Sequence, residues 1–173
     1  MDPFYTFLVF AGVLVFEQLA AQMWLPAYYR FGLPIFIARR NKNQRRTAGE
    51  MARALEGAFG GRAEHPTIRF RPIDARVIAI RETLFENRGG FRYFPIMHSV
   101  VQVLPEKNAV QVTGYINAYI MVALVYLVYR AWTEPGFLPV AILILFVLGV
   151  SYAAQSGINR RIVEEAARDQ PHE

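Results

Sequence analysis

One carboxylate lies within the long apolar segment that opens the chain. Glu17 is the single charged residue between Pro3 and Tyr29, and two amides, Gln18 and Gln22, lie close to it. A carboxylate in the hydrocarbon core of a bilayer raises the free energy by at least about 2.5 kcal/mol unless it is protonated or has a partner. The chemistry open to Glu17 is therefore hydrogen bonding, pairing with another group or proton binding.

Two later apolar segments carry polar residues at a depth comparable with that of Glu17, if each helix rises about 1.5 Å per residue. We therefore predict an intramembrane polar layer of Glu17, Gln18, Gln22, Asn117, Tyr119, Ser151, Tyr152 and Gln155. The first interpretation is that these residues form interhelical hydrogen bonds. The alternatives are pairing with another subunit, binding of a cofactor, and translocation of a proton or an ion.

A second set of residues is basic. It consists of Arg39, Arg40, Lys42, Arg45 and Arg46, which follow the first apolar segment, and of Arg69 and Arg71, which share one face of a predicted strand. These side chains suit anionic lipid headgroups or another anionic ligand. The alternative is that the first five only orient the chain in a membrane and that the last two are solvated.

Catalytic motifs are missing from the sequence. The three histidines, His65, His98 and His172, have no metal-ligand spacing, and the chain has no cysteine. No phosphate-binding loop, dinucleotide fingerprint, serine elbow or zinc-protease motif occurs. We therefore predict a non-enzymatic protein without a metal site or a cofactor.

The elements that position these residues follow from hydropathy. The 173 residues are 54% hydrophobic, and three segments are long enough to supply the roughly 20 mostly apolar residues that a membrane span needs. We expect an α+β integral membrane protein with three transmembrane helices, at residues 1–29, 114–132 and 136–157. Of the 19 basic residues, 18 lie in 30–113 and 157–173. Because basic residues stay inside, this predicts the N-terminus outside and the C-terminus in the cytosol.

The segment between the first two predicted spans has its own pattern. Residues 30–46 are expected to be a basic interfacial segment, and residues 158–173 a cytosolic helical tail. Thr47 and Glu50 have the spacing of a capping box before a short amphipathic helix. Alternating residues then predict about five short antiparallel strands, at 67–71, 76–81, 91–94, 99–104 and 109–113. The last two flank a four-residue turn at 105–108 and are expected to form a hairpin. Residues 47–113 are therefore a small cytosolic β-domain, with its helix packed on the sheet.

Three functions are compatible with this arrangement. The first is an accessory or scaffold subunit that binds a partner protein through the β-domain. It acts as a homo-oligomer or within a larger membrane complex, and the small residues Gly149, Ala153 and Gly157 support close helix packing. The second is an oligomeric effector or channel that senses an anionic ligand, and the third is a lipid-modifying enzyme. We expect contact with membrane lipids, no nucleic acid, and location in the bacterial inner membrane.

Overall fold

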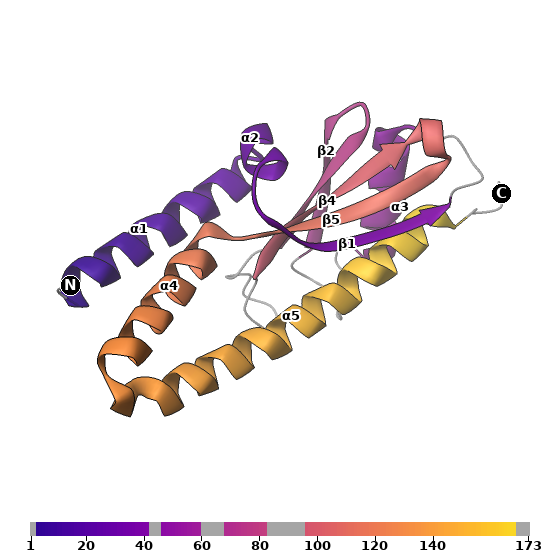
Figure 1. The fold of residues 1–173 in the computed structure, drawn as a ribbon. Coiled ribbons are helices and arrows are strands. Elements are labelled where there is room, and N and C mark those ends of the chain that lie inside the picture. The colour runs from indigo at the N-terminus through magenta and orange to yellow at the C-terminus, as the bar shows by residue number, and fades with distance from the viewer. Residues whose placement is uncertain (1–2, 42–45, 60–67, 83–95, 169–173) are drawn as a thin grey trace.

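The computed structural model describes residues 3–41, 46–59, 68–82 and 96–168, which form an α+β structure in two parts (Figure 1). One part is a five-stranded antiparallel sheet with a helix beside it. The other part is a group of apolar helices that extends from one end of the sheet. The elements are α1 (Pro3–Gln22), α2 (Pro26–Arg30), β1 (Pro34–Asn41), α3 (Ala48–Phe59), β2 (Ile68–Asp74), β3 (Val77–Glu82), β4 (Met97–Leu104), β5 (Ala109–Ile116), α4 (Ala118–Thr133) and α5 (Leu138–Ala167), with short 3₁₀ turns η1 (Pro105–Lys107) and η2 (Pro135–Phe137).

The strands lie in the order β1-β5-β4-β3-β2, and every neighbouring pair is antiparallel. The predicted hairpin is confirmed, because β4 and β5 pair from Met97 with Ile116 to Leu104 with Ala109. Strand β1 was not expected from the sequence. It occupies much of the predicted interfacial segment 30–46 and pairs with β5. The predicted strand at 91–94 lies outside the described residues.

One face of the sheet holds the main hydrophobic core. Ile78, Val101, Val110 and Val112 are fully buried there beneath α3 and the C-terminal half of α5. The capping box that begins α3 is confirmed. The Thr47 amide donates to Glu50 Oε2 at 2.8 Å, and the Glu50 amide donates to Thr47 Oγ1 at 3.3 Å. This reciprocal pair satisfies backbone groups at the helix start, so that α3 can present its apolar face to the sheet.

The opposite face carries a smaller aromatic cluster. Tyr29 of α2 is buried against Ala79 and Val100, and Trp24 and Tyr28 pack beside it. The chain reaches this face because α1 ends at Gln22 and Trp24 has a φ of 55°. A residue in the left-handed region ends a helix, and Pro26 then starts α2 in a new direction.

The prediction of three transmembrane helices is wrong, because only one helix of the described residues is long and apolar enough to span a membrane. The predicted span 1–29 is divided by the turn at Trp24: α1 ends at Gln22, and its apolar stretch over the described residues is Leu8–Gln22, below the length of a span. The predicted span 114–132 shares its first residues with β5, and α4 keeps only Ala118–Thr133. A helix of that length rises about 24 Å, which is shorter than the ~30 Å hydrocarbon core.

The remaining candidate is the helix at Pro135–Ala167, which includes α5. Its mean hydropathy reaches 2.4 over an 18-residue window, and 11% of that window is buried within the chain. Helix α5 runs without a break from the apolar part to the sheet, where Ile162, Val163 and Ala166 join the core. It is the element that ties the two parts of the molecule together.

Candidate ligand-binding site at the junction of helices and sheet

The carboxylate of Glu17 lies against the start of α4. Its Oε1 accepts a hydrogen bond from the Ala118 amide at 2.7 Å, and its Oε2 accepts one from the Tyr119 amide at 3.1 Å. The first amides of a helix have no partner within the helix, and the helix dipole favours an anion there. Glu17 is buried, with 5% of its surface exposed, and acts as a helix cap supplied by a distant segment.

A network of polar side chains surrounds Asn117, the residue between β5 and α4. Its Oδ1 accepts from the Tyr28 hydroxyl at 3.3 Å and from His98 Nδ1 at 3.0 Å. Its Nδ2 donates to the Tyr119 hydroxyl at 3.3 Å. The network joins α2, β4 and α4, and three of its members, His98, Asn117 and Tyr119, are buried. It therefore fixes the orientation of the His98 ring.

His98 is the least satisfied member of this network. Its ring packs between the rings of Tyr28 and Tyr115, with centroids at 4.2 and 5.5 Å. With Nδ1–H directed at Asn117, Nε2 is left as an acceptor, and this buried atom has no hydrogen-bond partner among the residues that the structure describes. Burial lowers the pKa of His98, while Asn117 and the carbonyls of Phe31 and Tyr28 oppose the shift. The ring is therefore neutral at neutral pH.

The network borders a pocket of about 510 Å³ between α1, the α2–β1 connection and the start of α4. Three polar side chains line it, those of Glu17, Tyr28 and His98. Its apolar walls come from α1 and α4 and from the segments beside β1 and β5, through Val13, Phe16, Phe31, Leu33, Ile116 and Met121. Sites for small molecules have this size, mostly apolar walls and a few polar groups.

Gly32 is necessary for the shape of this pocket. Its φ is 149°, a conformation that side chains rarely adopt, and an added Cβ would lie 2.9 Å from Tyr115 Cβ. The glycine lets the chain turn sharply from α2 into β1 and pass close to β5. Phe31 and Leu33, on either side of it, remain exposed at the pocket.

The predicted polar layer separates into two groups. Glu17, Asn117 and Tyr119 come together at the pocket, while Gln18 lies partly buried and Gln22 exposed on α1. Gln155 of α5 instead contacts the sheet: its Oε1 accepts from the amides of Ile96 and Met97. Tyr152 donates to the Ile35 carbonyl at 3.0 Å, and Ser151 is buried on α5.

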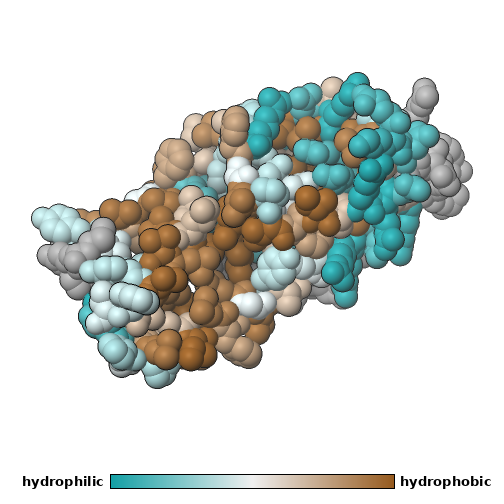
Figure 2. All heavy atoms as spheres, viewed as in Figure 1, coloured by the Kyte–Doolittle hydropathy of each residue, from teal (hydrophilic) through white to brown (hydrophobic). Residues whose placement is uncertain are grey.

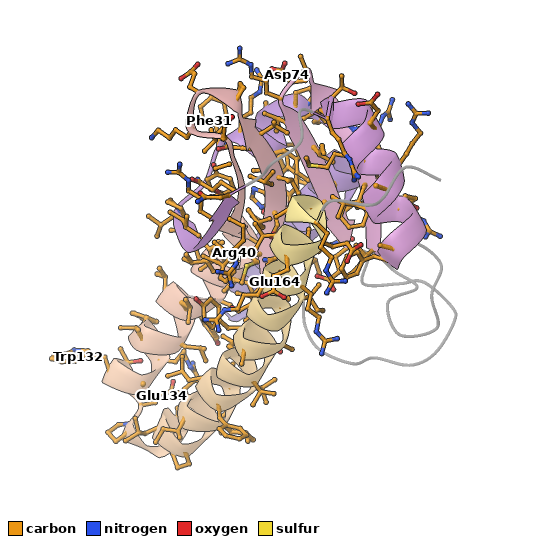
Figure 3. The ribbon with its side chains drawn as sticks, turned by 90° about the vertical axis from the view of Figure 1, so that its right-hand side faces the viewer. Phe31, Arg40, Asp74, Trp132, Glu134 and Glu164 are labelled. Carbon is orange, nitrogen blue, oxygen red and sulfur yellow. The ribbon has the colours of Figure 1, made fainter. Side chains whose placement is uncertain are left out.

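The predicted anion-binding residues do not form one surface in the described part of the chain. Arg39 and Arg40 lie on β1, and Arg69 and Arg71 lie on β2, at the opposite edge of the sheet. Arg40 lies 3.5 Å from Glu164 of α5 (Figure 3), and Arg69 lies 3.6 Å from Glu56 of α3. Arg46 precedes α3, and Lys42 and Arg45 lie outside the described residues.

The small residues Gly149, Ala153 and Gly157 are exposed on α5. A Cβ added at Gly149 or Gly157 would have nothing within 4 Å. This face of α5 therefore packs against nothing in the described part of the chain, and a role in contacts between chains stays a prediction.

Sequence reasoning missed His98 and Tyr28 as members of the site. His98 has no metal-ligand spacing, and Tyr28 lies near the end of the predicted span 1–29, where nothing in the sequence marks it as a site residue. The signal was the predicted hairpin itself: continued by a few residues on each strand, its register places His98 opposite Tyr115, two residues before Asn117.

Comparison of the chain with protein-family models, with curated proteins and with solved structures finds no match. In the described residues no group of three or more His, Asp or Glu side chains is placed to hold a metal ion. The functional interpretation therefore depends on the pocket, on the surface around it and on the chemistry of His98.

Proposed function

We propose that the protein is a non-enzymatic binding protein anchored in a membrane, with a pocket for an apolar small molecule where its helices meet its sheet. The observation that carries this proposal is the pocket, whose apolar walls surround one buried imidazole. The roles predicted from the sequence, as an accessory subunit or an oligomeric channel, stay predictions.

The distribution of apolar surface supports a membrane anchor. Figure 2 shows hydrophobic residues gathered over the helical part and hydrophilic residues over the sheet. In the described chain, every large apolar residue that is exposed lies in 5–37 or 121–152. Soluble proteins rarely expose a continuous apolar surface of this extent. Lipid is the partner that covers such helices on all outward sides.

The charges at the two ends of the anchor fit this location. From Pro135 to Asn159 the chain has 25 residues without a charge, which as a helix would extend about 37 Å and exceed the ~30 Å hydrocarbon core. Trp132, which is 89% exposed, and Glu134 lie at the far end of the helical part (Figure 3). Arg160 and Arg161 follow at the sheet end. The excess of basic residues there supports a cytosolic sheet domain.

Extraction of native membranes tests the anchor. The protein should remain in the pellet after alkaline carbonate and leave it only with detergent. The double variant Leu143→Arg, Phe146→Arg should lose this resistance, because each arginine in the hydrocarbon raises the free energy by about 2.5–3.5 kcal/mol. Glu164→Arg introduces the same side chain beside the sheet and should stay in the pellet. Recovery of the parent protein as a detergent-free soluble species would contradict the anchor.

A glycine pair tests the pocket. Gly12 lines the pocket, and Gly149 does not, and a Cβ at either position meets nothing within 4 Å. In lipid nanodiscs the parent protein should bind neutral twelve-carbon probes saturably, above the level of empty nanodiscs. Gly12→Leu should fill the pocket and abolish binding, whereas Gly149→Leu should leave it unchanged. Equal binding by both variants, or no saturable binding at all, would overturn the proposed pocket.

A further inference from the structure

Of the polar side chains that line the pocket, only His98 keeps an atom without a hydrogen-bond partner in the described part of the chain. Both oxygens of Glu17 accept backbone hydrogen bonds, and the Tyr28 hydroxyl donates to Asn117. His98 has only 8% of its surface exposed, and its Nε2 makes no hydrogen bond to any described residue. A buried polar atom without a partner is destabilising, so a bound molecule that satisfies Nε2 gains free energy.

From this we infer that the pocket takes a neutral, lipid-like molecule whose polar end is a hydroxyl group that donates a hydrogen bond to His98 Nε2. This inference rests on the proposed function and adds the chemistry of the ligand's polar end. The donor requirement follows from the tautomer, because Nδ1–H is directed at Asn117 and leaves Nε2 with a lone pair.

The charge of the ligand follows from the other groups at the wall. Neither arginine nor lysine is among the described residues that line the pocket, and the Glu17 carboxylate is. A carboxylate or phosphate end would therefore lose its hydration among mostly apolar walls, beside the Glu17 carboxyl group and without a cation to offset its charge. An ammonium end would lose its hydration against mostly apolar walls, while both Glu17 oxygens already accept hydrogen bonds from the start of α4. An uncharged hydroxyl avoids both penalties.

The position of the pocket indicates how such a molecule would reach it. Phe16, Phe31 and Leu33 line the pocket and are 67%, 75% and 58% exposed. They belong to the same apolar surface that the proposed anchor exposes to lipid. A lipid-like ligand can therefore enter from the bilayer with its chain against these residues and its hydroxyl toward His98.

The test compares three probes of equal chain length with the full-length protein in nanodiscs: 1-dodecanol, 1-methoxydodecane and dodecanoate. We expect the alcohol to bind roughly tenfold or more tightly than the ether, which cannot donate, and than the carboxylate. Labelling with ¹⁵N-histidine gives signals from only three side chains. The His98 Nε2 signal should be that of an unprotonated nitrogen and should shift only with the alcohol.

A ring of similar shape provides the matched variant. His98→Phe keeps the contacts with Tyr28 and Tyr115 but has no acceptor, so both the alcohol and the ether should bind it with similar affinity. If the alcohol and the ether bind the parent protein equally, or if the proton lies on Nε2, the hydroxyl requirement is overturned while the pocket stands. If no probe binds saturably, the proposed function itself fails.

Discussion

The role of the Glu17 carboxyl group follows from the groups that surround it in the folded protein. The sequence predicts that a carboxylate in an apolar helix is protonated or has a partner, and interhelical hydrogen bonding is its first interpretation. In the structure both of its oxygens accept backbone amides at the start of α4, a role for which the ionised form is suited. The residue therefore joins α1 to α4 and completes a helix whose first turn lies at the pocket.

Replacing Glu17 tests this role. Glu17→Ala should destabilise the folded protein by about 1.5–3 kcal/mol, the range for hydrogen bonds to charged groups, because two amides lose their acceptor. Glu17→Gln should lose less, since its carbonyl can still accept. Thermal unfolding in detergent micelles, followed by circular dichroism, measures both. Glu106→Ala, at a side chain that is 83% exposed, is the control. Unfolding of Glu17→Ala at the parent temperature would contradict the cap.

Depth along the predicted helices relates some of the residues that the structure brings together. Counting along the helices related Glu17 to Asn117 and Tyr119, which do meet. The same count could not orient α5, so it assigned Gln155 to the layer although that amide contacts β4. The place of His98 in the site could not be predicted for another reason. Its contact with Asn117 results from the pairing of β4 with β5 and from the chain turn after Ile116.

The elements that could be predicted from the sequence are those defined by residues close together in the chain. The Thr47–Glu50 capping box and the β4–β5 hairpin depend on residues close in the chain, and both were predicted. Strand β1 depends on β5, about 75 residues later, and its apolar run beside basic residues is equally typical of an interfacial segment. A strand defined by a distant partner leaves little trace in its own sequence.

Gly114 allows β1, β4 and β5 to pack closely. An added Cβ would lie too close to the buried side chain of Met97 and 3.3 Å from Phe36 Cβ. Gly114→Ala should therefore destabilise the protein by about 1–3 kcal/mol through overpacking. Gly57→Ala makes the same change on α3, where nothing lies within 4 Å, and should stabilise it by about 0.5–1 kcal/mol. Equal unfolding temperatures for the two variants would contradict the close packing.

A group of hydrogen bonds joins α5 to the first residues of β4, where the apolar part of the molecule meets the sheet. The side-chain oxygen of Gln155 accepts from the amides of Ile96 and Met97. Its Nε2 donates to Glu82 at 2.6 Å and to the Met97 carbonyl at 3.2 Å. Just beyond it, Asn159 donates to Ser99 at 3.0 Å. These bonds hold the continuous helix to the sheet, so the position of the apolar part is tied to that of the polar domain.

This contact makes the stability of the whole molecule depend on pH. Burial raises the pKa of Glu82 to about 7 from an ordinary value of 4.5, against the opposing hydrogen bond from Gln155. Between these values the folded protein keeps a proton that the unfolded chain has released, so its stability falls as the pH rises from 4.5 to 7 and is then level. At 1.36 kcal/mol per unit the loss is on the order of 3 kcal/mol.

Glu82→Gln isolates this effect, because its amide is neutral at every pH. Denaturant unfolding in micelles at pH 4.5, 6 and 8 should show the variant gaining on the parent protein as the pH rises, with the full difference reached above pH 7. Glu106→Gln removes an exposed carboxylate and should follow the parent protein throughout. A difference that stays constant from pH 4.5 to 8 would show that Glu82 titrates alike in the folded and unfolded chains, and that the junction does not bury its charge.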